Sequence, residues 1–210
     1  MNALELVQQS PVIPVIVIKD VDLAVDLAKA LVQGGVRCLE ITLRSCVAID
    51  AIRLISQEVP EAIVGVGTVR KAGQLEAAVD AGAQFAVSPG LTRELSDAAR
   101  ASGIPFLPGI ATPSESMHAA DQGHLVQKLF PAEAVGGVAL LKSIYGPMPD
   151  IVFCPTGGIS PRNARNYLAL PNVQCVGGSW LTPESIVANR QWGAVTQLAR
   201  EACALTGAHA

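Results

Sequence analysis

Eight short runs of apolar residues, rich in valine and isoleucine, recur along the whole chain, and stretches with helical periodicity separate them. Short runs with little polar alternation are typical of strands that are buried on both faces, as in a parallel sheet. In the first helical stretch, Leu23–Val32, apolar residues recur every three to four positions. We expect strands at Pro14–Ile18, Arg37–Thr42, Ala62–Gly67, Gln84–Val87, Ile104–Leu107, Leu125–Leu129, Ile151–Cys154 and Val173–Val176.

Strands that alternate with helices predict a parallel α/β fold, and eight such units are the number that closes a barrel. The order of the units alone also fits an open, doubly wound sheet. The 210 residues contain no linker, low-complexity tract or charge block, so one domain is expected over residues 1–210. We therefore predict a single-domain (β/α)₈ TIM barrel with a short N-terminal helix. Glycines at expected left-handed helix ends agree with this pattern: Gly34, Gly35, Gly82, Gly103 and Gly123.

Charge and hydropathy argue against several kinds of partner. The formal net charge is −3 and lysines and arginines form no cluster, which disfavours a nucleic-acid partner. The apolar run from Val12 to Ile18 contains Pro14 and is too short to span a bilayer. The N-terminus shows no basic segment followed by an apolar one. We expect a cytoplasmic protein that does not contact a membrane.

Cysteine and histidine positions bear on disulfides and metals. The five cysteines are scattered without a CxxC pair, which is typical of reduced thiols. His118, His124 and His209 show no ligand spacing, so no metal site is expected. The segment Gly65–Thr68 lacks the full spacing of a dinucleotide fingerprint, and we expect no cofactor.

The second expected strand carries a carboxylate among apolar residues. Alternation places Leu39, Ile41 and Leu43 on the face that suits contact with helices. Glu40, Thr42 and Arg44 lie on the other face, which leaves Glu40 pointing into the barrel. A buried carboxylate costs several kcal/mol unless it is paired or protonated. A structural ion pair with Arg44 or with a lysine is one explanation, and a catalytic acid/base is the other.

Lys128 is one of five lysines and the only one set within an expected apolar strand. Lys19 is its one rival, at the end of the first strand, but the neighbouring Asp20 suggests a solvated pair. An amine attacks a carbonyl only when neutral, and burial at an apolar strand end favours the neutral form. A structural pair with Glu40 remains the alternative. Directed into the same barrel mouth, Lys128 and Glu40 would supply the nucleophile and the acid/base that imine chemistry requires.

Paired glycines follow each of the last two expected strands, at Gly157-Gly158 and Gly177-Gly178. Glycine lets backbone N–H groups approach an oxyanion, and barrels commonly bind phosphate in these two loops. Two such pairs predict a substrate with a phosphate at one end. At the end of the third strand, Thr68 would bind a carboxylate together with Arg44, whose guanidinium donates in a bidentate fork. A simple helix cap is the alternative for Thr68.

These motifs, in this order, resemble those of the bacterial 2-keto-3-deoxy-6-phosphogluconate aldolases, which often also act on 4-hydroxy-2-oxoglutarate. The resemblance extends from about Pro11 to Ala202. Leu129 stands where the family often has Phe, and Ser45 where it commonly has Thr, but neither departure touches the expected catalytic residues. The stretches that carry the resemblance are Glu40–Arg44, Gly65–Thr68, Ser88–Gly90, Lys128–Glu133, Phe153–Gly158 and Gly177–Trp180.

The resemblance implies a cofactor-independent Schiff-base aldolase that assembles as a homotrimer. It would cleave 2-dehydro-3-deoxy-6-phosphogluconate to pyruvate and glyceraldehyde 3-phosphate, and 4-hydroxy-2-oxoglutarate to pyruvate and glyoxylate. Lys128 would form the Schiff base and Glu40 would be the acid/base. The other implied site residues are Arg44 and Thr68 for the substrate carboxylate, Gly157, Gly158 and Ser179 for the phosphate, and Pro89, Phe130 and Thr156 elsewhere in the pocket.

Other functions fit the same residues. The closest alternative is cleavage of 2-keto-3-deoxy-6-phosphogalactonate, which differs in configuration at C4. A lyase or decarboxylase that acts mainly on unphosphorylated keto acids such as oxaloacetate is a second. A metal-dependent aldolase is disfavoured because no ligand cluster is present in the sequence. The non-enzyme alternative is a phosphate-binding barrel in which Lys128 and Glu40 form a structural pair.

Overall fold

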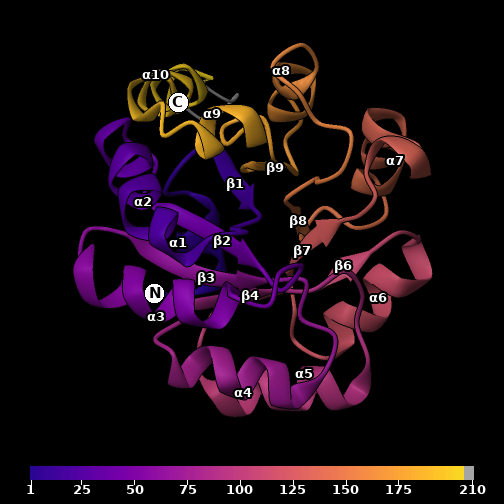
Figure 1. Ribbon diagram of the computed structural model, residues 1–210. Helices are drawn as coiled ribbons and strands as arrows, with labels where there is room; N and C mark the ends of the chain where they lie inside the picture. Colours follow the sequence, from indigo (N-terminus) through magenta and orange to yellow (C-terminus); the bar gives the residue numbers. More distant parts are fainter. Residues whose placement is uncertain (206–210) are drawn as a thin grey trace.

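A curled parallel sheet lies at the centre of the molecule, with helices arranged around it (Figure 1). The computed structural model describes residues 1–205, so His209 lies outside the described residues. The strands are β1 (Val12–Ile16), β2 (Cys38–Thr42), β3 (Ile63–Gly67), β4 (Phe85–Val87), β5 (Phe106–Leu107), β6 (Gly109–Ile110), β7 (Val126–Leu129), β8 (Val152–Phe153) and β9 (Val176–Gly178).

The helices fall between the strands in the order that the sequence predicts. The expected short N-terminal helix is confirmed as α1, where Asn2 and Glu5 form a capping box. The α-helices are α1 (Ala3–Val7), α2 (Ala24–Gln33), α3 (Ala48–Glu58), α4 (Ala72–Asp80), α5 (Arg93–Ser102), α6 (Pro113–Asp121), α7 (Gly137–Tyr145), α8 (Ala164–Leu168), α9 (Glu184–Ala188) and α10 (Trp192–Cys203). Two 3₁₀ turns are η1 (Val21–Leu23) and η2 (Glu133–Val135).

The strand ladders are parallel and form two sheets. One sheet has the order β5-β4-β3-β2-β1-β9 and the other has the order β6-β7-β8. Between β8 and the region of β9 lie two isolated parallel bridges, Phe153 with Val173 and Thr156 with Gly177. The parallel arrangement confirms the α/β class expected from the sequence.

Five of the expected strands match the observed ones to within one residue at each end, and the other three differ by more. β1 begins two residues earlier than predicted because Val12 pairs with Val176 of β9, and it ends two residues earlier because its last pair with β2 is Ile16 with Ile41. β9 is correspondingly later, at Val176–Gly178. The expected strand Ile104–Leu107 is followed by a second short strand beyond Pro108, which has no N–H to donate. The carbonyl of Pro108 instead accepts a hydrogen bond from the Lys128 N–H at 2.8 Å.

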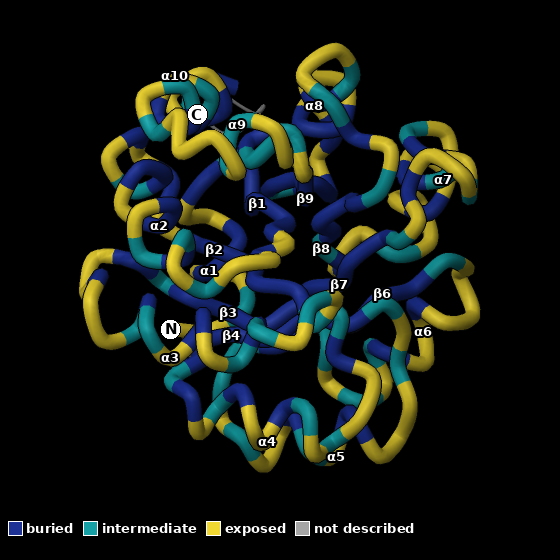
Figure 2. The backbone as a smooth tube through the Cα atoms, in the orientation of Figure 1, coloured by how far each residue is buried: buried dark blue, intermediate teal, exposed yellow. Residues whose placement is uncertain are grey.

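Two apolar clusters sit on the two faces of the sheet. The larger fills the space between strands and surrounding helices and includes Leu39 and Ile41. The smaller joins strand residues such as Phe85 and Cys175 to Leu6 of α1. Figure 2 shows the strands buried along most of their length, while the helices expose their outer sides. Glu40 and Lys128 therefore lie in an almost fully buried sheet.

All five cysteines are free, and three of them are buried. Cys38, Cys154 and Cys175 belong to the smaller apolar cluster. Burial raises the pKa of the Cys38 thiol to about 12, and the nearby charge of Arg37 opposes this only in part. Among residues 1–205, no helix is long and apolar enough to cross a membrane.

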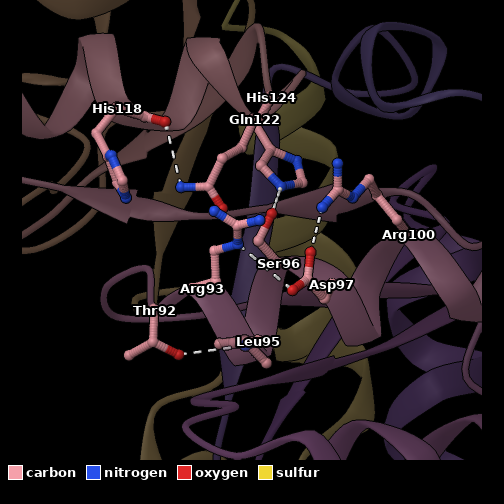
Figure 3. Close-up of polar contacts among 9 residues, drawn as sticks. All are labelled: Thr92, Arg93, Leu95, Ser96, Asp97, Arg100, His118, Gln122 and His124. Atoms are coloured by element: carbon pink, nitrogen blue, oxygen red, sulfur yellow. Dashed lines mark hydrogen bonds and ion pairs between the residues drawn. The ribbon is translucent and has the colours of Figure 1, made fainter.

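His124 joins the start of β7 to helix α5. Its Nε2 lies 2.8 Å from the Ser96 hydroxyl, and its ring packs edge-on against Phe106 with centroids 5.4 Å apart. Figure 3 shows the imidazole directed at Ser96, with Asp97 and Arg100 on the same helix. Burial lowers the pKa of His124 below its ordinary value of 6.5, and the charge of Arg100 lowers it further.

This lowered pKa predicts that acid destabilises the fold through His124. The unfolded chain takes up the proton first, so stability present above pH 6.5 is lost as the pH falls from 6.5 toward the folded-state pKa. In urea titrations across this range, a His124→Gln variant should lose less unfolding free energy than the parent. Exposed His118 gives the matched control, His118→Gln, which should retain the parental pH dependence. Equal pH dependence in all three proteins would contradict the prediction.

Candidate active site

A cavity of about 370 Å³ opens beside the C-terminal ends of the strands. Its walls come from segments far apart in the sequence, including β2, β7 and the loops after β8 and β9. All ten site residues predicted from the sequence line it: Glu40, Arg44, Thr68, Pro89, Lys128, Phe130, Thr156, Gly157, Gly158 and Ser179. Val15, Ile159, Gly177 and Gly178 also line the cavity and were not among the predicted site residues.

Lys128 and Glu40 meet at the floor of the cavity. The Lys128 Nζ lies 3.5 Å from the Glu40 Oε1, and the two side chains are only 7% and 3% exposed. The amine also lies 5.2 Å from the centre of the Phe130 ring. Both groups are shielded from bulk water on most sides, yet both border the cavity. The arrangement places an amine and a carboxylate where a single small molecule would contact both.

The alternation predicted for the second strand is confirmed. Leu39 and Ile41 belong to the cluster under the helices, and Leu43 packs against it. Glu40 and Arg44 face the cavity. Glu40 therefore lines the site because the period of a strand is two residues. Thr42 does not line the cavity, because its hydroxyl donates to the Ile16 carbonyl at 2.7 Å.

The Lys19 alternative is not supported by its position. Lys19 pairs with Glu184 of α9 at 2.5 Å, and its side chain is 66% exposed. The solvated character predicted for Lys19 is confirmed, but Asp20 is not its partner. Asp20 instead accepts a hydrogen bond from the N–H of Asp22 at 3.0 Å. An exposed lysine stays hydrated, so it lacks the burial that favours the neutral, nucleophilic form of an amine.

Gly67 at the end of β3 packs directly against the Glu40 side chain. A Cβ at this position would lie 2.6 Å from the Glu40 Cγ and would overlap the Oε1. The register of β2 and β3 produces this contact, because Gly65 pairs with Glu40 and Gly67 pairs with Thr42. The sequence shows the glycine but not its neighbour, so this contact was missed. Only the strand register reveals it.

Thr68 follows Gly67 with a left-handed backbone, φ = +64°. A β-branched residue is a genuine outlier in this region, because its Cβ crowds the backbone. Such strain costs about 1–3 kcal/mol and tends to persist at binding and catalytic sites. A left-handed residue is not a helix N-cap, and helix α4 begins only at Ala72. The cap explanation of Thr68 is therefore wrong.

The loop after β8 presents unused donors to the cavity. Gly157 and Gly158 have φ = +102° and +79°, values that glycine adopts at little cost. Within residues 1–205, neither N–H group donates to a protein acceptor. Ser179 also lines the cavity, two residues after Gly177, which forms a bridge with Thr156. Free N–H groups and a hydroxyl form a suitable environment for an oxyanion.

Comparison with known proteins agrees with this geometry. The family model described as "Aldolase: KDPG and KHG aldolase" matches residues 4–198. The KHG/KDPG aldolase of Escherichia coli (strain K12) is 55% identical over 201 residues, which cover 96% of this chain and 94% of the relative.

Two solved structures are similar over almost the whole chain. The KDPG aldolase from Legionella pneumophila, with pyruvate captured as a covalent carbinolamine, superposes with a TM-score of 0.95 at 47% identity, covering 97% of this chain and 98% of that one. The 2-keto-3-deoxy-6-phosphogluconate aldolase of Zymomonas mobilis ZM4 with 3-phosphoglycerate superposes with a TM-score of 0.92 at 44% identity. The match covers 99% of this chain and 97% of that one. The chain belongs to the KDPG and KHG aldolase family.

Proposed function

We propose that this protein is a class I aldolase that cleaves 2-dehydro-3-deoxy-6-phosphogluconate to pyruvate and glyceraldehyde 3-phosphate. The observation that carries the proposal is the buried Lys128–Glu40 pair, 3.5 Å apart on the floor of a cavity that also holds free backbone donors. The E. coli relative is named for both KHG and KDPG, which favours cleavage of 4-hydroxy-2-oxoglutarate to pyruvate and glyoxylate as well.

The proposed reaction begins when the neutral Lys128 amine attacks the C2 ketone. Glu40 transfers the protons that convert the carbinolamine to an iminium ion with loss of water. The Glu40 carboxylate then takes the proton of the C4 hydroxyl, the C3–C4 bond breaks, and its electron pair moves to the iminium as an enamine. The aldehyde leaves, Glu40 returns the proton to C3, and water releases pyruvate from Lys128.

The remaining residues would fix the substrate along the cavity. Arg44 and Thr68 are proposed to bind the carboxylate, since a guanidinium fork and a hydroxyl suit two oxygens. The phosphate would bind the N–H groups of the loop after β8. Held at both ends, the substrate would present C2 to the amine with little freedom, which lowers the entropic part of the barrier. The proposed phosphate residues are Gly157, Gly158 and Ser179, and the proposed pocket walls are Pro89, Phe130 and Thr156.

We infer further that the strands form one closed eight-stranded barrel within a single domain. β5 and β6 would act as one strand bent at Pro108, which pairs with β4 on one side and β7 on the other. The bridge between Thr156 and Gly177 supports closure on the opposite side. A homotrimer and a cytoplasmic location remain predictions.

Reduction of the Schiff base tests the proposal directly. The protein is incubated with pyruvate and borohydride, and the intact mass is measured before peptide mapping. A reduced pyruvyl adduct on Lys128 is the expected result. A folded protein that forms no adduct would favour the phosphate-binding alternative. Values of kcat/KM for the gluconate substrate, its galactonate epimer and oxaloacetate then decide the substrate, and retention of activity in EDTA excludes the metal-dependent route.

Gly67→Ala should slow turnover without blocking the Schiff base. The new Cβ would displace Glu40, and a misplacement of about 1 Å costs on the order of 10²-fold in rate. We expect kcat to fall by roughly that factor, while pyruvate and borohydride still modify Lys128. The matched control is Gly73→Ala on α4, where a Cβ would meet nothing within 4 Å. Parental kcat in Gly67→Ala would show that the contact is unimportant.

A further inference from the structure

Glu133 contacts the loop that carries Gly157 and Gly158 and is hydrogen-bonded to Tyr167, and neither residue lines the cavity. Tyr167, on α8, is among the largest fully buried side chains, and its hydroxyl donates a hydrogen bond to the Glu133 carboxylate. Burial raises the pKa of the Tyr167 hydroxyl, and the bond to Glu133 and its charge raise it further. Tyr167 therefore remains a donor throughout the physiological range.

Glu133 touches the loop through both its backbone and its side chain. Its N–H donates to the Gly157 carbonyl at 3.1 Å. Its Cγ packs so closely on Gly158 that a Cβ there would lie 2.5 Å away. Since Glu133 stands five positions after Lys128 in the chain, the same segment connects the amine to this loop.

The planarity of the peptide bond links the hydrogen bonds accepted by the loop carbonyls to the directions of the Gly157 and Gly158 N–H groups. Each carbonyl shares a planar trans peptide with the next N–H, which points the opposite way. Ala132 donates to the Thr156 carbonyl at 2.8 Å, which fixes the direction of the Gly157 N–H. Glu133 fixes the Gly158 N–H in the same manner. The segment Ala132–Glu133 thus orients both free donors.

The Glu133 carboxylate also has an electrostatic effect on this loop. A carboxylate beside a bound phosphate would repel it, and the repulsion grows as water is excluded. Tyr167 holds the carboxylate by a charge-assisted hydrogen bond. Loss of that bond would free an anionic side chain next to Gly158 and loosen the segment that aligns the donors.

We propose that Glu133 and Tyr167 are positioning residues that align the backbone donors of Gly157 and Gly158 and thereby set the preference for phosphorylated over unphosphorylated keto acids. The inference rests on the proposed aldolase function. It assigns no chemistry to either residue, because neither borders the cavity. Substrates without a phosphate do not use these donors, and their cleavage should be indifferent to the pair.

The test compares two substrates in Tyr167→Phe and Glu133→Ala. For 2-dehydro-3-deoxy-6-phosphogluconate we expect KM to rise roughly tenfold with kcat little changed, as loss of one charge-assisted hydrogen bond implies. For 4-hydroxy-2-oxoglutarate, kcat/KM should stay within about twofold of the parent. Glu133→Gln keeps an acceptor for Tyr167 and should retain most of the parental KM. Tyr145→Phe, on exposed α7 surface, is the matched control and should change nothing.

The outcomes distinguish a failure of the positioning role from a failure of the proposed aldolase function. A parent that cleaves neither substrate contradicts the proposed function itself. An active parent whose Tyr167→Phe variant loses both substrates equally, or neither, overturns the positioning role. If Tyr167→Phe fails to fold, as judged by circular dichroism, Glu133→Ala decides alone, because Glu133 is exposed and its truncation opens no cavity in the apolar core, although the Tyr167 hydroxyl loses its acceptor.

Discussion

Replacing Lys128 by methionine is expected to abolish aldol cleavage. The variant has no amine to form the imine, so turnover should fall by at least ~10⁴-fold, as for other enzymes that lose a covalent nucleophile. Methionine fills a similar volume in a strand whose residues are all buried. Glu40 loses its partner 3.5 Å away, but it borders the cavity, where water can bind it. We therefore expect the fold to survive, and the pyruvate adduct with borohydride to disappear.

The control for this variant is Lys142→Met. Lys142 lies exposed on α7, so its loss should leave both turnover and the adduct unchanged. Lys19→Met serves as a second control, because Lys19 was the one rival nucleophile and pairs with Glu184 instead. Retained turnover in Lys128→Met would remove Lys128 from the mechanism. An adduct that persists in Lys128→Met and vanishes in Lys19→Met would transfer the role to Lys19.

The site was predictable because polar residues interrupt strands that are otherwise apolar. Glu40 and Lys128 each occupy a position where burial carries a large cost, and a fold retains such groups for a structural or functional reason. Strand periodicity gave the direction of Glu40, and barrel geometry gave the common end at which both would lie. The structure places both residues on one cavity, as expected.

Other features depend on contacts that no local pattern encodes. The first strand continues in the sequence as Val17 and Ile18, yet the ladder ends at Ile16, and Val17 is exposed. Apolar character there extends beyond the ladder, whose last pair is Ile16 with Ile41 of β2. The bond between Tyr167 and Glu133 joins residues 34 positions apart. A tyrosine and a glutamate at that separation in sequence do not predict a hydrogen bond, so this contact is seen only in the folded chain.

Glu40→Gln should slow each proton transfer of the reaction, including those that form the imine, while Lys128 keeps its amine. Glutamine keeps the shape of the side chain and an oxygen to face the Lys128 amine, but it cannot carry the proton between C4 and C3. Loss of a general acid/base slows turnover by roughly 10²–10⁴-fold. Exchange of the pyruvate methyl hydrogens in deuterium oxide, which needs the same base, should slow by a similar factor. Borohydride should still trap pyruvate on Lys128 during a long incubation.

A double variant tests whether Gly67 acts on the same step. If the glycine matters only because it leaves room for Glu40, Gly67→Ala should add little to the defect of Glu40→Gln. The matched control, Glu76→Gln on the exposed side of α4, should keep parental turnover and exchange. Unchanged kcat in Glu40→Gln would remove Glu40 from the acid/base role. Independent, multiplying losses in the double variant would mean that Gly67 affects catalysis by a route other than the placement of this carboxylate.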